Sequence, residues 1–439
     1  MRSGGLLLFL LALPGTAIGA PASRLSATER KLTQSIDAHR DASEALLERV
    51  VNINSGTMNT AGVRAVGDAF RAELDGLGFR TRWVDGAAFG RAGHLVAERP
   101  AAAASPGLRV LLIGHLDTVF ETDSPFQRFE RLDGQRVRGP ATTDMKGGDV
   151  IMLLALRALR DAGVLDRLDV RVYLGGDEED SGAPLSRARE ALLAAAKGAE
   201  VAIGFEDGDG RFETAVVARR GVEEWRLSVT GKPAHSSLIL NPEIGPGAIY
   251  EAARILDGFR RELAPESAEV TFNPGMIVGG TSLEHPELAR GTAFGKTNVI
   301  AQTALVVGDL RTLAPEQLER TRSRMQEIVA RSLPHTRAEL VFEPGYPPMA
   351  VTEGNRRLLA LFDETSRDLG LGAVGPVNPR QAGAADISFV AGTVRMALDG
   401  VGQMGSGGHT VEETADLALL APQAKRVAVL LARLAAGRR

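Results

Sequence analysis

The chain has 439 residues, of which 44% are hydrophobic and 24% are charged, which is enough apolar material and length for two or three domains. Its 51 basic and 55 acidic residues give a net charge of −4 without a long run of one sign, which excludes the basic surface that nucleic-acid binding requires. Because there is no cysteine, disulfides, thiolate metal ligands and a cysteine nucleophile are also excluded. Any bound metal must therefore be held by His, Asp and Glu.

The N-terminus has the pattern of an export signal. A basic start at Met1 and Arg2 precedes an apolar run over 6–14, and Ala20 and Ala22 fit the small-x-small pattern of a cleavage site. The run is shorter than the about 20 apolar residues of a membrane span, and no later stretch is long enough. We expect residues 1–22 to be a signal peptide and the mature protein to be secreted or periplasmic, with no membrane segment.

The sequence after this segment alternates between helical patterns and short buried strands. The expected elements, in chain order, are a helix over 26–51, a strand over 108–118, a helix over 150–161, a strand over 168–174, a helix over 190–197 and a strand over 201–205. Ser26 or Thr28 is expected to cap the first helix, and Asp149 to open the second. Such alternation predicts an α/β domain whose mainly parallel sheet is covered by helices on both faces.

The pattern changes near residue 222, where polar and apolar residues begin to alternate. The expected elements from there are a strand over 224–229, a helix over 247–262, strands near 269–272 and over 298–310, a helix over 315–331 and a strand over 338–342. This order is typical of a small ferredoxin-like α+β sandwich. We expect it to interrupt the α/β domain, so that 23–218 and 336–439 form one domain and 219–335 an inserted one.

Polar residues cluster just beyond the predicted strands, where open α/β sheets bind their ligands. His115 and Asp117 lie at the end of the strand expected over 108–118, and alternation along it places both on one side. Asp117 can accept the second ring proton of His115 and so turn its other nitrogen toward a metal, although a buried histidine satisfied by a neighbouring acid fits equally well. Asp144, before the next helix, could be a helix cap, but Asp149 already fits that role.

Four adjacent acids, Asp177 to Asp180, follow the strand that ends at 174. A solvated loop is the alternative, but a nearby divalent ion would turn their repulsion into attraction, and such oxygen ligands together with histidine suit zinc. Glu178 and Glu179 point in different directions on extended chain, so one can bind metal while the other acts as a base. Glu206 adds another acid, with Asp207 and Asp209 as competitors for its role, and His409 lies in a loop with three glycines.

Six segments resemble the zinc-dependent exopeptidase and deacylase family that includes carboxypeptidase G, acetylornithine deacetylase, succinyl-diaminopimelate desuccinylase and aminoacylase. They occur in the family's order, at 114–119, 144–148, 177–179, 205–206, 231–236 and 408–410. The resemblance implies a three-layer α/β/α zinc-peptidase-like catalytic domain with an inserted dimerisation domain. Two sequence departures stand out: Ala-Thr-Thr at 141–143 replaces a more glycine-rich stretch, and 343–347 lacks the arginine that carboxypeptidase G carries there.

The resemblance also implies a role for each matched residue. One zinc ion would be held by His115, Asp144 and Glu206, and a second by Asp144, Glu179 and His409. Asp117 would orient His115, and Glu178 would be the general base. The implied oxyanion donor is His235, which would reach the active site of a partner subunit in a homodimer; a surface turn histidine is the alternative. The implied substrate-binding residues are Asn298, Arg311 and Arg380.

The function expected on this basis is hydrolysis of an amide bond in a peptide or an N-acyl amino acid, as in glutamate carboxypeptidases. A deacetylase or desuccinylase of the same fold is an alternative within the class. A binding protein that has kept the fold without catalysis is an alternative from another class, although every expected catalytic position is filled.

Overall fold

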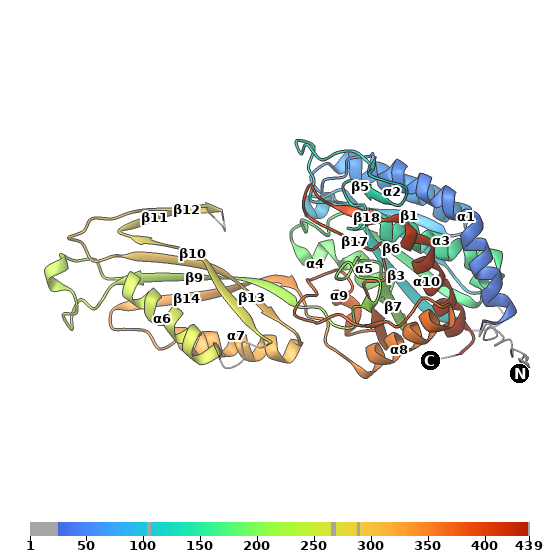
Figure 1. The fold of residues 1–439 in the computed structure, drawn as a ribbon. Helices are drawn as coiled ribbons and strands as arrows, with labels where there is room; N and C mark the ends of the chain where they lie inside the picture. The colour runs from blue at the N-terminus through green and yellow to red at the C-terminus, as the bar shows by residue number, and fades with distance from the viewer. Residues whose placement is uncertain (1–24, 103–106, 265–268, 288–289, 438–439) are drawn as a thin grey trace, which may run out of the picture.

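The computed structural model describes residues 25–102, 107–264, 269–287 and 290–437, which form a larger and a smaller unit side by side (Figure 1). The expected signal peptide at 1–22 lies outside the described residues. Within the described ranges, none of the helices has the length and apolar character needed to cross a membrane.

The larger unit is built on a six-stranded sheet. Strands β6, β3, β7 and β16 run parallel to one another, in agreement with the predicted mainly parallel sheet. Strands β1 and β2 were not anticipated, and β2 pairs antiparallel with both β1 and β6. In spatial order the strands are β1 Arg80–Asp85, β2 Gly93–Arg99, β6 Leu168–Gly175, β3 Leu108–His115, β7 Val201–Gly204 and β16 Met396–Leu398.

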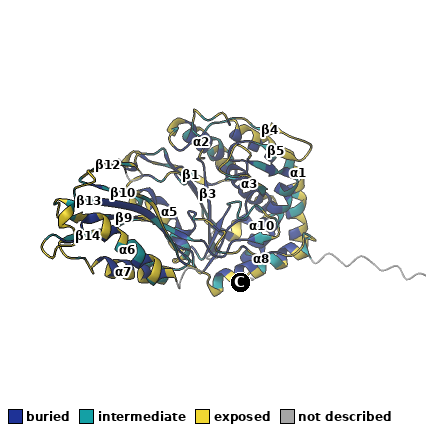
Figure 2. Ribbon diagram, turned by 60° about the vertical axis from the view of Figure 1, so that its left-hand side comes forward, coloured by how far each residue is buried: buried dark blue, intermediate teal, exposed yellow. Residues whose placement is uncertain are grey.

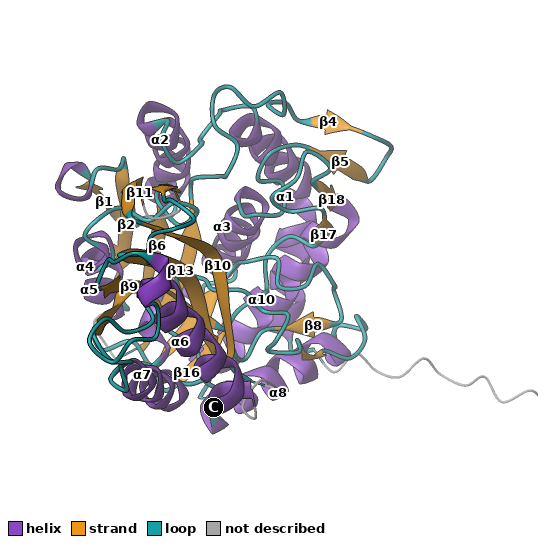
Figure 3. Ribbon diagram, turned by 90° about the vertical axis from the view of Figure 1, so that its left-hand side faces the viewer, coloured by secondary structure: helices purple, strands orange, loops and turns teal. Residues whose placement is uncertain are grey.

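Helices cover both faces of this sheet because successive strand residues point to opposite sides. On β3, for example, Leu112 packs toward one core and Leu111 toward the other. Figure 3 shows α4 and α5 on one side of the sheet and α1, α3 and α10 on the other, so the predicted three-layer α/β/α architecture is confirmed. The helices are α1 Ala27–Val51, α2 Thr60–Gly76, α3 Lys146–Asp161, α4 Leu185–Ala188, α5 Glu190–Ala196, α8 Glu353–Asp368, α9 Ser388–Ala391 and α10 Leu420–Ala435.

Short strands complete the larger unit near the loops that carry the polar clusters. A small four-stranded sheet has the order β17-β18-β5-β4, and β8 pairs parallel with β15. Their bounds are β4 Glu130–Arg131, β5 Arg136–Arg138, β8 Thr214–Ala215, β15 Gly375–Pro376, β17 Gly405–Ser406 and β18 Thr414–Asp416.

The smaller unit is an antiparallel sheet of order β10-β13-β9-β14 with two helices on one face. Trp225 lies fully buried between that face and the helices, and Figure 2 shows buried residues concentrated there. The expected strand-helix-strand-strand-helix-strand order is present, with one additional hairpin, β11–β12. The elements are β9 Gly221–Gly231, α6 Ala248–Leu263, β10 Thr271–Gly280, β11 Ser282–Glu287, β12 Arg290–Phe294, β13 Thr303–Thr312, α7 Pro315–Val329 and β14 Thr336–Tyr346.

The domain boundaries at 218/219 and 335/336 stay predictions. Strand β14 pairs with β9 from Thr336 to Tyr346. This pairing favours a second boundary after Tyr346, because β14 is part of the small sheet although the expected division assigned it to the larger domain.

The start of α3 differs from the sequence-based expectation. The helix begins at Lys146, its N-cap Met145 makes no side-chain cap hydrogen bond, and Asp149 lies buried within the first turn. The prediction that Asp149 opens the helix is therefore wrong. Its carboxylate packs against Gly114 of β3, where a Cβ atom would lie 2.0 Å from Asp149 Oδ1. The helix starts early because its first turn is pressed into the interior, where burial outweighs the preference for a polar cap.

Close packing at Gly148 brings α3 against the end of β7. A Cβ atom at Gly148 would lie 2.0 Å from the carbonyl oxygen of Phe205, so no larger residue fits without movement. The Gly148→Ala variant should lose about 1–3 kcal/mol of unfolding free energy in urea titrations, because overpacking displaces the backbone. The matched control is Gly76→Ala in α2, where a Cβ atom meets nothing within 4 Å and the change should be neutral or slightly stabilising. Equal stability of the two variants would contradict this view of the contact.

Candidate metal centre and active site

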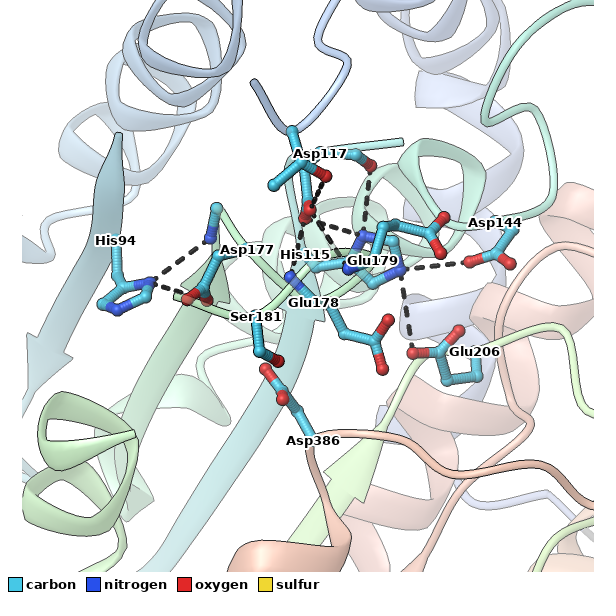
Figure 4. Close-up of polar contacts among 12 residues, drawn as sticks. His94, His115, Asp117, Asp144, Asp177, Glu178, Glu179, Ser181, Glu206 and Asp386 are labelled. Atoms are coloured by element: carbon cyan, nitrogen blue, oxygen red, sulfur yellow. Dashed lines mark hydrogen bonds and ion pairs between the residues drawn. The ribbon is translucent and has the colours of Figure 1, made fainter. Parts of the chain in front are cut away.

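The predicted polar residues converge at the carboxyl ends of three neighbouring strands. His115 is the last residue of β3, Glu178 and Glu179 follow β6, and Glu206 follows β7 (Figure 4). Since β3 lies between β6 and β7 and is parallel to both, their loops open at the same edge of the sheet. Asp144 arrives from the loop before α3, and the later chain contributes His409 from the loop between β17 and β18.

Two groups of three side chains could each hold a metal ion. In the first, His115 Nε2 lies 3.0 Å from Asp144 Oδ1 and 3.8 Å from Glu206 Oε1. In the second, His409 Nε2 lies 3.0 Å from Asp144 Oδ2 and 3.0 Å from Glu179 Oε2. Within each group the ligand atoms all lie within 4.8 Å of one another. The two groups share Asp144, which offers one oxygen to each.

The donor set fits zinc chemically. Imidazole nitrogen and carboxylate oxygen are ligands that zinc accepts, and three protein ligands with a fourth, open position are typical of catalytic zinc sites. Glu179 Oε1 is buried without a hydrogen-bond partner in the described part of the chain, as expected of an atom that a cation would satisfy. His409 has a φ of 64°, a left-handed conformation that is unusual for a non-glycine residue and is typical of functional loops.

Asp117 fixes both His115 and the loop after β6. Its backbone carbonyl accepts a hydrogen bond from His115 Nδ1 at 3.1 Å, and its Oδ1 lies 3.4 Å from the same nitrogen, which leaves Nε2 to face Asp144. The same carboxylate accepts hydrogen bonds from the backbone N–H groups of Glu178 and Glu179, each at 3.1 Å, and from the Thr57 hydroxyl at 2.7 Å. One buried acid thus orients an imidazole and two neighbouring glutamates.

The four-acid run after β6 is divided between structure and site. Its outer members pair with arginines: Asp177 Oδ1 accepts from Arg189 Nη1 at 2.7 Å, and Asp180 Oδ1 lies 2.8 Å from Arg91 Nη2. The inner members, Glu178 and Glu179, face the centre instead (Figure 4). The solvated-loop alternative therefore does not describe this segment.

Crowding shifts the pKa values of the carboxyl groups. Burial raises the pKa of Glu178 and of Glu206 well above the usual range; the charge of His115 opposes the shift, and Asp144 adds to it. Burial, together with the charge of Asp144, raises the pKa of Glu179 to about 7. Burial alone would raise the pKa of Asp144 as well, but hydrogen bonds from the imidazoles of His115 and His409 hold that pKa below its usual range. A divalent cation would favour the charged forms of all these groups.

The competitors of Glu206 lie outside both groups. Among the described residues, Asp207 belongs to neither of the two metal-binding groups, and burial raises its pKa to about 7. Asp209 serves its own turn, since its Oδ1 accepts from the backbone N–H of Arg211 at 3.3 Å and from the Thr214 hydroxyl at 2.5 Å. The structure thus brings Glu206, rather than either neighbour, to His115.

Two supporting contacts were missed by the sequence analysis. Glu413 accepts hydrogen bonds from the backbone N–H groups of Ala141 at 3.0 Å and Thr143 at 2.8 Å, and so holds the loop before Asp144. Asp399 accepts from Arg219 Nε at 2.7 Å, and from the backbone N–H of Glu206 at 3.3 Å. These partners are separated by up to 272 residues, so no local pattern points to them.

The expected oxyanion donor and substrate-binding residues lie elsewhere. His235 is exposed in the smaller unit, where its Nδ1 accepts from the Ser237 N–H at 3.2 Å, and Asn298 lies beside it through a backbone hydrogen bond to Ser236. Arg311 pairs with Asp309 at 2.8 Å, and Arg380 is exposed. In the described ranges none of these four forms a recorded contact with either metal-binding group, and their roles stay predictions.

Comparison with known proteins gives a consistent picture. The family model described as peptidase family M20/M25/M40 matches residues 111–433. Carboxypeptidase G2 from Pseudomonas sp. (strain RS-16) is 24% identical over 435 residues, which cover 98% of each chain. Aminopeptidase PepT from Bacillus cereus has a similar fold, with a TM-score of 0.68, 19% identity and coverage of 90% of this chain and 99% of that one. A Bacillus subtilis structure described as a dinuclear metal-binding peptidase from the M20 family gives a TM-score of 0.61, 16% identity and coverage of 91% and 99%.

The Glu413→Gln variant tests whether the hydrogen bonds of Glu413 to the loop before Asp144 support metal binding. In Glu413→Gln an amide group replaces one acceptor oxygen and faces backbone donors, so zinc affinity should fall by about 10- to 100-fold. Competition with a chromophoric chelator measures this affinity. The control is Glu412→Gln, which changes the exposed neighbouring acid and should leave affinity unchanged. Unaltered zinc affinity in Glu413→Gln would show that the loop does not need this support.

Proposed function

Because the chain belongs to peptidase family M20/M25/M40, we propose that it is a two-zinc hydrolase that cleaves an amide bond in a peptide or an N-acyl amino acid. The family makes it a peptidase or amidohydrolase; the number of ions, the catalytic roles and the substrate are the proposal. The observation that carries it is the position of Asp144, whose two oxygens contact imidazoles from separate three-residue groups. One ion would be held by His115, Asp144 and Glu206, and the other by Asp144, Glu179 and His409.

Zinc bound at this centre would supply Lewis acidity for the scissile carbonyl and lower the pKa of an attacking water toward ~7. The chain supplies the proton transfers. Glu178 belongs to neither metal-binding group, and burial raises its pKa, which suits a group that takes a proton from water and passes it to the leaving nitrogen. Asp117 keeps its backbone in place through a hydrogen bond of 3.1 Å.

The proposed substrates carry a free carboxylate beside the scissile amide. Arg311 of the smaller unit and Arg380, in the loop after β15, lie near Arg220. Burial lowers the pKa of Arg220, and the positive charges of Arg311 and Arg380 lower it further. The positive charges of these three arginines would favour binding of the substrate carboxylate, and an arginine can bind a carboxylate through two hydrogen bonds. Asn298 would add a polar contact. Similarity to a protein named carboxypeptidase G2 supports a carboxypeptidase-like reaction.

We also propose that two copies associate through the smaller unit. Tyr250, Ile277 and Phe294 are 58%, 55% and 60% exposed there, and β10 is an edge strand, so a partner surface would cover apolar groups that now face solvent. In such a homodimer His235 would reach the partner's centre and donate a hydrogen bond to the oxyanion of the tetrahedral intermediate. Export through residues 1–22 would place this reaction outside the cytoplasm.

The proposed reaction is tested with zinc-loaded mature protein and a panel of dipeptides, acyl-glutamates and acetylated or succinylated amino acids. Carboxypeptidase-like activity predicts hydrolysis of dipeptides and acyl-glutamates and loss of hydrolysis when the terminal carboxylate is amidated. Preference for acetylated or succinylated amino acids would favour the deacetylase or desuccinylase alternative. A protein that binds zinc and hydrolyses none of them would favour the non-catalytic alternative.

The Glu178→Gln variant tests the general base. Since the amide cannot accept a proton, kcat should fall by about 10²- to 10⁴-fold while zinc content, measured by mass spectrometry of the metal, stays at the wild-type level. Asp180→Asn is the control, because it changes an exposed acid of the same run that pairs with Arg91, and kcat should remain within about twofold. Full activity in Glu178→Gln would refute the assignment.

The action of His235 across subunits is tested by complementation. Chains with His235→Ala and with Glu178→Gln, each inactive alone, are co-expressed with different tags. A mixed dimer contains one complete centre, so random pairing should restore roughly a quarter of the wild-type activity, since half of the dimers are mixed and each has one intact centre. If His235 acted within its own chain, the mixture would stay inactive.

A further inference from the structure

The last strand of the smaller unit ends in the larger unit. Tyr346 is the final residue of β14 and still pairs with Val222 of β9. Its ring packs edge-on against Phe389, with ring centroids 4.9 Å apart and an interplanar angle of 61°. Phe389 belongs to α9 of the larger unit, so this one side chain joins the small sheet to the catalytic layers.

The Tyr346 hydroxyl lies against the loop that carries Glu178. It donates to the backbone carbonyl of Glu178 at 3.0 Å and lies 3.2 Å from the Ser181 hydroxyl. It also accepts a hydrogen bond from Arg189 Nη2. The loop is therefore held at Glu178 and at Ser181 by a group that belongs to the other unit.

Arg189 makes this attachment rigid. Its guanidinium is 1% exposed and lies between two buried acids, with Nη1 2.7 Å from Asp177 Oδ1 and Nε 2.8 Å from Asp386 Oδ1. A further hydrogen bond of 2.8 Å runs from Nη2 to Ser181. Because both acids pair with this arginine, its position is fixed, and the Tyr346 hydroxyl that contacts it is fixed as well.

The backbone of Glu178 is thus held from two sides. Asp117 accepts from its N–H at 3.1 Å, and Tyr346 donates to its C=O at 3.0 Å. Figure 4 shows the Glu178 carboxyl on the side of Glu206. Since the direction of a side chain follows its backbone, both hydrogen bonds set where that carboxyl points.

We propose that Tyr346 is a positioning residue for Glu178, through which the inserted unit fixes the loop of the catalytic base. The inference rests on the proposed function, which makes Glu178 the base. The part of Tyr346 that acts on catalysis is the hydroxyl, which holds the loop of Glu178, and not the ring. The ring alone would retain the packing against Phe389.

The test compares Tyr346→Phe with wild-type zinc enzyme. Removal of the hydroxyl should lower kcat about tenfold while KM changes less than about twofold and zinc content is unchanged. Amide hydrogen exchange of peptides covering 176–182 should become faster. Ser35→Ala is the control, because it removes a hydroxyl whose hydrogen bond to Asp161, at 2.7 Å, joins α1 to the end of α3 and does not involve residues 176–182. This variant should match wild type in every measurement.

A second variant separates positioning from a general loss of structure. Ser181→Ala removes another contact of the same hydroxyl, so its effect on kcat and that of Tyr346→Phe should be non-additive in the double variant. Wild-type kcat and wild-type loop exchange in Tyr346→Phe would overturn the inference, as would a loss of kcat matched by loss of zinc. If wild-type enzyme hydrolyses nothing in the panel, the proposed function fails, whereas an active wild type with an unaffected Tyr346→Phe defeats the positioning role alone.

Discussion

Repulsion between carboxylates at one edge of the large sheet is the interaction on which the rest of the centre depends. Asp144, Glu178, Glu179 and Glu206 crowd around His115, and burial would make so many negative charges costly without cations. Burial, together with the charge of Asp144, raises the pKa values of these three glutamates, so protonation would relieve part of this cost. Two divalent cations would oppose the repulsion by binding the carboxylates, and would also explain why two separate groups of ligand atoms share the oxygens of one aspartate.

The fold resists this repulsion with close packing and with its own buried cations. Gly148 allows the start of α3 to press on the end of β7, and thus brings Asp144 toward Glu206. Arg189 and Arg219 neutralise Asp177 and Asp399 beneath the centre, with N–O distances of 2.7 Å in each case. Such buried pairs are weak contributors to net stability, but the loss of one partner leaves an unpaired buried charge. Their value here is geometric, because both pairs hold loops that carry predicted catalytic groups.

The layers, and the gathering of polar residues at one edge of the sheet, could be predicted because both depend on local patterns. Apolar runs that end in acids or histidine identify β3, β6 and β7, and parallel strands open at one edge. The division of these residues into two metal-binding groups was implied by the resemblance to the exopeptidase and deacylase family alone. The antiparallel strand β1 was missed because its residues are exposed or half-buried and carry little apolar signal. Glu413 and Tyr346 were missed for another reason: the hydrogen-bond partners of their side chains lie 157 or more residues away, and only the tertiary fold brings them together. The capping role expected of Asp149 failed because burial of the helix start is also a tertiary effect.

The most direct test of the account is the location of bound metal. Anomalous diffraction at the zinc absorption edge, from crystals of the zinc-loaded protein, would locate each ion without any assumption about activity. Two peaks are expected, one on each side of the Asp144 carboxylate, between the imidazoles of His115 and His409. A single peak, or zinc bound anywhere away from Asp144, would contradict it.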